Sequence, residues 1–266
     1  MTEISKIRKK EIEELANFIA EDYCPTGLVL PELIANASEL SYNYGDYKDS
    51  FDGILEHANG LFHIYLNKKL TLNSDNPRLR FSFAHELGHY FIDEHRNALM
   101  KGISLHKSYY HYLRRNIVEK EADYFASNLL MPTKRFENDV FRKKFNFSLI
   151  NSLSKTYGVS ITACAFRFSD IGNHPILIVY AENNIIKWTK YSHDFPFKYL
   201  IDRNYVPENT VMGEYFHGLN KDEVHKTEKV WAIDCFSYVS DNDIQRQFYE
   251  HCIPFKNRAL SIFWED

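Results

Sequence analysis

The stretch FSFAHELGHYFIDEH, residues 81–95, places His85, Glu86 and His89 in the pattern H-E-x-x-H. On a helix, residues four apart share a face, so the two imidazoles can bind one metal ion. Glu86 lies beside them, where it can take a proton from a metal-bound water rather than bind the metal. The apolar residues around the pattern favour a helix, so we expect a metal centre with Glu86 as general base.

The third protein ligand is the open question, and His95 is the nearest candidate. The three histidines have the spacing of H-E-x-x-H-x-x-G-x-x-H, but Ile92 stands where that pattern has glycine. Glycine would let the chain turn sharply out of the helix, and a β-branched residue disfavours such a turn. If the helix continues, His95 lies roughly opposite His89. We therefore expect His95 to be a surface histidine near a helix C-terminus rather than a ligand.

A later helix offers carboxylates instead. The segment VEKEADYFASNLLMP, residues 118–132, contains Glu119, Glu121 and Asp123. Glu119 and Asp123 are four apart and share a face, which suggests Glu119 on the metal and Asp123 behind, accepting the proton of a ligating histidine. Glu121 points about 200° away from Glu119 on an ideal helix, so we expect it to be solvated.

The small residues of the two helices predict where they meet. Gly88 would let another element approach the H-E-x-x-H helix closely, and Ala122, Phe125 and Ala126 mark the packed side of the later helix. Small residues at such positions fit a tight two-helix site.

The periodicity of apolar residues predicts the other elements. Helices are expected over residues 4–22 and 30–40, from about Pro77, over 118–132, and as two or three short helices within 133–168. Residues 41–53 read as a loop. Strands are expected over 60–67 and, after Asn173, at 174–181, 184–192, 229–239 and 258–266.

This order predicts an α+β protein with two domains. Residues 1–170 form an α-rich catalytic domain with a small sheet and an active-site helix, and residues 171–266 form a β-rich domain. The helices near 148–168 have the outline of a helix-turn-helix. Because that segment is poor in basic residues, we expect it to pack rather than to read DNA.

Composition limits the classes of function. The chain has 266 residues, 44% hydrophobic and 26% charged, and a net charge of −4, so a global basic character typical of nucleic-acid binding is absent. No stretch approaches the roughly 20 apolar residues of a membrane helix, and the charged N-terminus lacks a signal-peptide core. The four cysteines form no CxxC pair, so we expect reduced thiols in a cytoplasmic protein.

Two segments together resemble a known family. RLRFSFAHELGHYFI is similar to the signature R-F-t-x-A-H-E-x-G-H of the ImmA/IrrE zinc metallopeptidases, and EKEADYFASNLLMP is similar to their E-x-x-A-[ND]-x-F-A-x-x-L-L-M-P. FDGILEHANGLFHIYLN resembles the family's strand before the active-site helix. The resemblance covers about residues 5–170. It implies a zincin-like domain with gluzincin-like binding of one Zn²⁺ by His85, His89 and Glu119, with Glu86 as general base; Mn²⁺ is the alternative metal.

The resemblance also implies a substrate class. Family members cut helix-turn-helix transcriptional repressors and so derepress stress, phage or mobile-element genes. Some carry a GAF-like sensor domain, which is the analogy for residues 171–266. If the strand at 60–67 is a sheet edge, a substrate segment could add as a strand along it. The oxyanion donor could be Tyr109, Tyr110, His111 or Tyr112.

Other functions remain open from the sequence. The chain could be a metallopeptidase toxin, a general-substrate protease, or a zinc-stabilised regulator that binds DNA or protein without cutting it. We expect a protein substrate, no direct binding of nucleic acid and no membrane association. The oligomeric state is not predicted.

Overall fold

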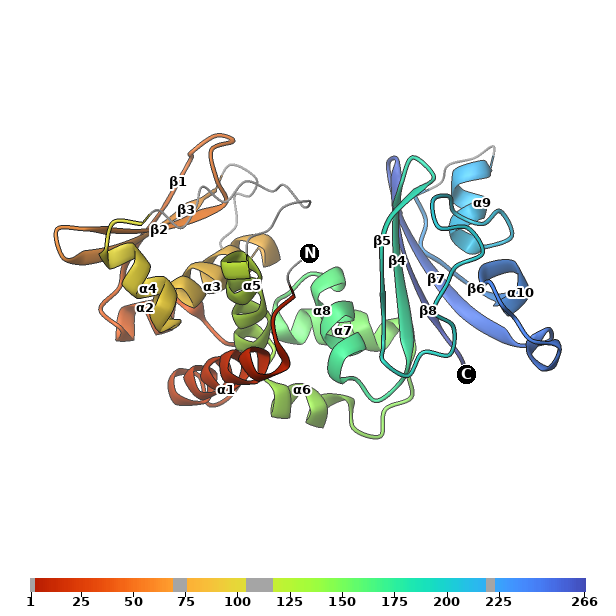
Figure 1. The fold of residues 1–266 in the computed structure, drawn as a ribbon, viewed down its shortest axis with the longest axis horizontal. Coiled ribbons are helices and arrows are strands. Elements are labelled where there is room, and N and C mark those ends of the chain that lie inside the picture. Colours follow the sequence, from red (N-terminus) through yellow and green to blue (C-terminus); the bar gives the residue numbers. More distant parts are fainter. Residues whose placement is uncertain (1–2, 69–75, 104–116, 219–222) are drawn as a thin grey trace. The chain divides into compact units, whose positions relative to one another are not determined.

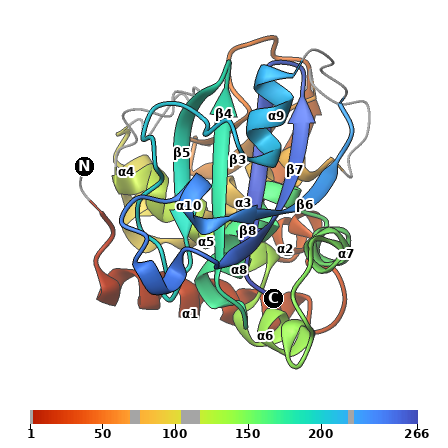
Figure 2. The same cartoon turned by 90° about the vertical axis from the view of Figure 1, so that its right-hand side faces the viewer.

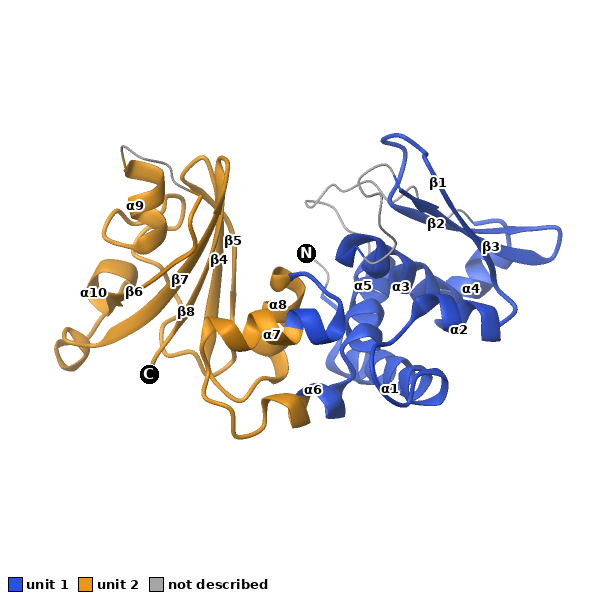
Figure 3. Cartoon of the chain, turned by 180° about the vertical axis from the view of Figure 1, so that it is seen from behind, with its two compact units in different colours: residues 1–136, 154–160 blue, residues 137–153, 161–266 orange. Residues whose placement is uncertain are grey.

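The computed structural model describes residues 3–68, 76–103, 117–218 and 223–266 (Figure 1). They form two compact units (Figure 3): residues 1–136 with 154–160, and residues 137–153 with 161–266. The division between residues 170 and 171 stays a prediction.

Among its described residues, the first unit holds five helices, the start of a sixth and the last turn of α7 (Phe147–Tyr157). Their bounds are α1 Lys6–Tyr23, α2 Pro31–Ala37, α3 Pro77–Phe91, α4 Asp93–Met100, α5 Ile117–Leu130 and α6 Thr133–Val140, of which α6 continues into the second unit. Helix α3 begins where Asn76 caps the backbone of Arg78 and Pro77 occupies the first turn, as proline prefers. The helices expected at 4–22, 30–40, from Pro77 and at 118–132 are therefore confirmed.

A three-stranded sheet completes the first unit. Its strands are β1 Ser41–Gly45, β2 Gly53–Ala58 and β3 Leu61–Asn67, in the order β1-β3-β2. β2 and β3 form a hairpin at Asn59 and Gly60, whose φ angles of 53° and 79° suit a type I′ turn. The strand expected at 60–67 is confirmed. However, β1 lies in a segment expected to be a loop, so that expectation is wrong. β3 is the central strand, so the condition for substrate addition along 60–67, that this strand is a sheet edge, is not met.

Helices α3 and α5 cross closely at a glycine. A Cβ atom on Gly88 would lie 3.1 Å from Phe125 Cδ1 and 3.2 Å from Ala122 Cα, closer than nine in ten real Cβ contacts. Ala122, Phe125 and Ala126 are fully buried. The expectation that small residues mark a tight contact between these two helices is confirmed.

The second unit is built on a five-stranded antiparallel sheet. Its strands are β4 Ile176–Glu182, β5 Ile185–Tyr191, β6 Lys226–Trp231, β7 Gln247–Phe255 and β8 Arg258–Trp264, in the order β5-β4-β8-β7-β6. Helices α9 (Val211–His217) and α10 (Ala232–Cys235) cover one face, and α8 (Ile161–Ile171) packs against β4 and β5 on the other (Figures 1 and 2). Helix α7 (Phe147–Tyr157) and the short 3₁₀ turn η1 (Asp241–Asp243) complete the described elements.

The α+β fold class is confirmed, with a small sheet among helices and a separate larger sheet towards the C-terminus. The strand expected at 229–239 is wrong in its second half, because the chain turns into α10 at Ala232. All four cysteines are unpaired and buried, as expected of reduced thiols. Among the described residues, every helix is too short or too polar to cross a membrane.

A buried carboxyl lies in the core of the second unit. Glu250 on β7 is fully buried and accepts hydrogen bonds from the Val211 amide at 2.6 Å, the Met212 amide at 3.1 Å and the Ser261 hydroxyl at 2.5 Å. Burial raises the pKa of Glu250 to about 7, even though these hydrogen bonds oppose the shift. The folded protein therefore holds a proton that the unfolded chain releases at a lower pH.

We expect this carboxyl to make the second unit less stable as the pH rises. Because the folded pKa is about 7 and the ordinary value 4.5, the stabilisation is full below about pH 4.5 and is lost as the pH rises through 7. The loss is at most about 3 kcal/mol. Glu250→Gln should flatten the profile. All three tryptophans lie in this unit, so urea unfolding followed by tryptophan fluorescence at pH 5 and pH 8 measures the effect.

Glu228→Gln is the matched control, because Glu228 on β6 lies opposite Glu250 on β7 in the strand register but has an exposed side chain. It should keep the wild-type pH dependence. The same pH dependence in Glu250→Gln and in wild type would contradict the assignment to Glu250.

Candidate metal centre

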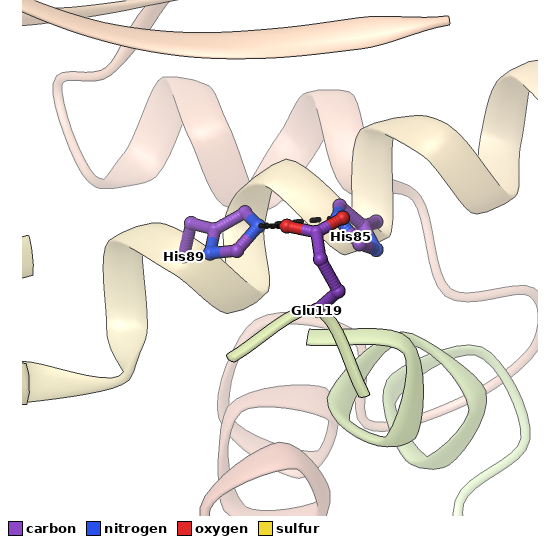
Figure 4. A group of neighbouring side chains, drawn as sticks. All are labelled: His85, His89 and Glu119. Atoms are coloured by element: carbon purple, nitrogen blue, oxygen red, sulfur yellow. Dashed lines mark hydrogen bonds and ion pairs between the residues drawn. The ribbon is translucent and has the colours of Figure 1, made fainter. Parts of the chain in front are cut away.

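Three side chains converge between α3 and α5 (Figure 4). His85 and His89 come from successive turns of α3, and their Nε2 atoms lie 3.1 Å apart. Glu119, in the first turn of α5, reaches across with Oε2 3.5 Å from His85 Nε2 and Oε1 3.3 Å from His89 Nε2. The structure therefore brings together the three residues that the sequence proposed as metal ligands.

The spacing of these donors fits a zinc ion. Ligand atoms about 2.0–2.1 Å from one tetrahedral ion lie about 3.3 Å from each other, and the observed separations run from 3.1 to 3.5 Å. Burial lowers the pKa of His89 to about 3, so this imidazole is neutral and has a lone pair to offer. Two imidazole nitrogens and one carboxylate, largely withdrawn from water, are a donor set that suits a divalent cation.

Asp123 lies behind His85. Its Oδ1 is 3.0 Å from His85 Nδ1, the nitrogen that faces away from the other donors. A carboxylate in this place keeps the ring proton on Nδ1 and leaves Nε2 free to bind a metal. This is the geometry expected from the four-residue spacing of Glu119 and Asp123, and the roles of both residues remain a proposal.

Glu86 is buried beside the donor group, against strand β2. It is 3% exposed and receives a hydrogen bond from the backbone amide of Leu55. Burial is the main cause that raises the pKa of Glu86 to about 7, while the nearby His85 opposes the shift. A carboxyl group with a pKa near neutrality is suited to accept and return a proton.

His95 is not a surface residue, so that expectation is wrong. Helix α3 ends because Ile92 adopts an extended backbone, with φ −76° and ψ 111°, and α4 starts at Asp93. A negative φ needs no glycine, so the chain turns sharply with isoleucine in place. His95 is only 3% exposed, and its Nδ1 lies 3.2 Å from His89 Nδ1. It contacts the outer nitrogen of His89 and is not part of the donor group.

Glu121 is buried as well, which corrects the expectation that it would be solvated. Its Oε2 lies 3.1 Å from His95 Nε2, and Arg8 of α1 donates to both of its carboxylate oxygens. An isolated helical wheel cannot reveal this contact, since α1 covers the side of α5 that would otherwise face water. The suggested oxyanion donors Tyr109, Tyr110, His111 and Tyr112 lie outside the described residues.

Comparisons with known proteins agree with this geometry. Residues 47–169 match a peptidase family model described as the IrrE N-terminal-like domain, which confirms the family resemblance and points to a metallopeptidase. No curated protein matches the chain. Among solved structures, a Mycobacterium tuberculosis transcriptional regulator has a TM-score of 0.64 and 14% identity, over 96% of this chain and 76% of that one. At this identity the likeness supports the fold alone.

Removing the Glu119 carboxylate should remove the metal. We expect the wild-type chain to retain one zinc ion after dialysis, and Glu119→Ala to bind zinc roughly 100-fold more weakly or worse, because one of three protein donors is lost. Metal content by mass spectrometry and competition with a chromogenic chelator measure this. Glu14→Ala, an exposed carboxylate on α1, is the control. If Glu119→Ala kept its full zinc content and His95→Ala lost zinc, His95 rather than Glu119 would be the third ligand.

Proposed function

We propose that this chain is a cytoplasmic zinc-dependent endopeptidase that cuts a helix-turn-helix transcriptional repressor. The proposed peptidase activity is supported by the group of His85, His89 and Glu119, with the buried carboxyl of Glu86 beside it. It lies within the residues that match a peptidase family. The repressor substrate rests on the family resemblance, and the solved neighbour is itself called a transcriptional regulator.

The chemistry divides between the metal and the protein. A zinc ion at the donor group would polarise the scissile carbonyl and make the attacking water more acidic. Glu86 accepts a proton from that water as the water oxygen forms a bond to the carbonyl carbon. Glu86 then gives the proton to the amine as the C–N bond breaks, so the residue ends as it began. A hydrogen bond from the Leu55 amide orients Glu86, and Asp123 orients the His85 ring.

Strand β2 offers an edge for the substrate. It pairs with β3 on one side, and no strand in the described part of the chain lies on its other side. The Leu55 amide donates to Glu86, which indicates that this free edge faces the general base. An extended peptide that pairs with β2 would thus bring its backbone carbonyls towards Glu86. This edge takes the place of β3 as the proposed site of strand addition.

Substituting the general base should separate metal binding from catalysis. Glu86→Gln keeps the size of the side chain but cannot accept the proton, so we expect zinc content to be unchanged and cleavage to fall by roughly 10²–10⁴-fold. The substrate is the repressor encoded beside this gene, incubated with and without a chelator, and intact mass identifies the products. Casein, as an unrelated protein, tests for general proteolysis. Cleavage retained in Glu86→Gln would overturn the mechanism, and cleavage of casein alone would overturn the substrate class.

Gly53 leaves the space that the Glu86 side chain occupies, so a larger residue there should slow peptide cleavage. A Cβ atom there would lie 2.9 Å from Glu86 Oε1 and 3.0 Å from Glu86 Cγ. We expect Gly53→Ala to push the carboxyl out of position and to lower the rate of cleavage by about 10-fold or more, with zinc retained. Glu56→Ala on the exposed side of the same strand is the control. Equal rates in the two variants would show that Gly53 does not position Glu86.

A further inference from the structure

A chain of polar contacts runs outward from His89. His89 Nδ1 lies 3.2 Å from His95 Nδ1, and His95 Nε2 lies 3.1 Å from Glu121 Oε2. Arg8 donates from Nε to Glu121 Oε1 at 3.1 Å and from Nη2 to Oε2 at 3.0 Å. His89, His95 and Glu121 are each at most 9% exposed. The contacts are therefore largely shielded from water, where an unmatched polar atom would be costly.

The direction of these hydrogen bonds is fixed at the outer end. The Glu121 carboxylate only accepts, so His95 must donate to it from Nε2. A neutral His95 then has a lone pair on Nδ1 and accepts from His89, whose proton must be on Nδ1. The opposite direction would set the bare Nε2 of His95 against a carboxylate oxygen, leaving two acceptors in contact. For neutral imidazoles, this arrangement alone satisfies both contacts of His95. It leaves His89 Nε2 unprotonated and facing Glu119, where a bound cation would lie between the two acceptors.

Arg8 stabilises the outer end of this series of hydrogen bonds. Its guanidinium binds Glu121 with two parallel hydrogen bonds, the geometry that best fixes a carboxylate. It also donates to Glu94 of α4, at 2.9 Å from Nη2. One side chain of α1 thus ties α4 and α5 together beside the donor group. Arg8 lies outside residues 47–169, the range that matches the peptidase family.

We propose that His95 is a positioning residue, which holds His89 with Nε2 towards the metal, and that Glu121 and Arg8 fix the tautomer of His95 that does so. The proposal rests on the metal centre of the proposed function. It assigns to His95 the part that Asp123 plays for His85, with a histidine inserted between ligand and carboxylate. Partners of this kind typically change metal affinity or activity by roughly 10–100-fold.

A pair of substitutions of equal shape separates positioning from packing. Leucine and asparagine have nearly the same shape, and only asparagine has an acceptor near the place of His95 Nδ1. We expect His95→Leu to bind zinc roughly 10–100-fold more weakly than wild type, and His95→Asn to recover most of the loss. Zinc affinity is measured by chelator competition on the full chain, and unfolding of the zinc-free proteins shows that both variants fold. Equal affinities in the two variants would overturn the proposal.

A second measurement reads the tautomers directly in the wild-type protein and then in two variants. In zinc-loaded protein with ¹⁵N-labelled histidine, long-range ¹H–¹⁵N correlation should show His95 protonated at Nε2 and His89 at Nδ1. Arg8→Gln should weaken zinc binding and shift His95 towards a mixture of tautomers, whereas Lys10→Gln, on the same helix with only an exposed partner, should change neither. His95 protonated at Nδ1 in the zinc-loaded wild type would overturn the proposal.

These measurements require no substrate, so the two proposals can fail separately. A wild-type chain that binds no zinc overturns the proposed function together with the positioning role. A chain that binds zinc equally well with His95, leucine or asparagine overturns the positioning role alone. A chain that binds zinc as expected but cuts no protein overturns only the peptidase activity.

Discussion

The metal centre depends on how closely α3 and α5 approach each other. Helices usually pack with their axes about 8–10 Å apart, and the side chains at the crossing decide where in that range they lie. Here the crossing residue is Gly88, and its neighbours Ala122 and Phe125 occupy the space that a side chain would take. Glu119 stands one turn before Ala122, so this contact sets its distance from the two histidines. A wider crossing would draw the carboxylate out of the range of 3.3 to 3.5 Å in which it meets both imidazoles.

Burial then determines what else the site must contain. An imidazole withdrawn from water needs a partner for its second nitrogen, since an unmatched buried donor costs about 1–3 kcal/mol. Asp123 meets this need for His85, and His95 meets it for His89. The same burial favours the neutral forms of these groups, so it lowers the pKa of His89 and raises that of Glu86. The candidate ligand His89 is thus neutral and able to bind a cation, and the pKa of Glu86 lies at about 7.

The sequence predicted those parts of the site that depend on one helix. The pattern H-E-x-x-H and the spacing of Glu119 to Asp123 follow from helical geometry alone, and both appear in the structure as expected. It failed where the backbone left the helix or another element intervened. Ile92 ends α3 with a negative φ, a backbone conformation that does not require glycine. Glu121 is buried by α1, whose contact with α5 joins residues more than 100 positions apart. Strand β7 was missed because glutamate, histidine and proline interrupt its apolar pattern, although Glu250 is satisfied by tertiary partners.

Each chemical part of the site is contacted by a different element. Strand β2 contacts Glu86 through the Leu55 amide, α5 contacts His85 through Asp123, and α4 contacts His89 through His95. The last contact differs from the other two because its direction is set further out, by an arginine on α1. Residues 47–169 contain the three residues of the donor group, yet Arg8, which donates to Glu121, lies outside them. If Glu121 loses the Arg8 guanidinium, its buried carboxylate can turn away or take up a proton. In either case His95 no longer has to donate a hydrogen bond to Glu121 from Nε2. The contacts around the candidate metal centre therefore extend beyond the matched range to α1.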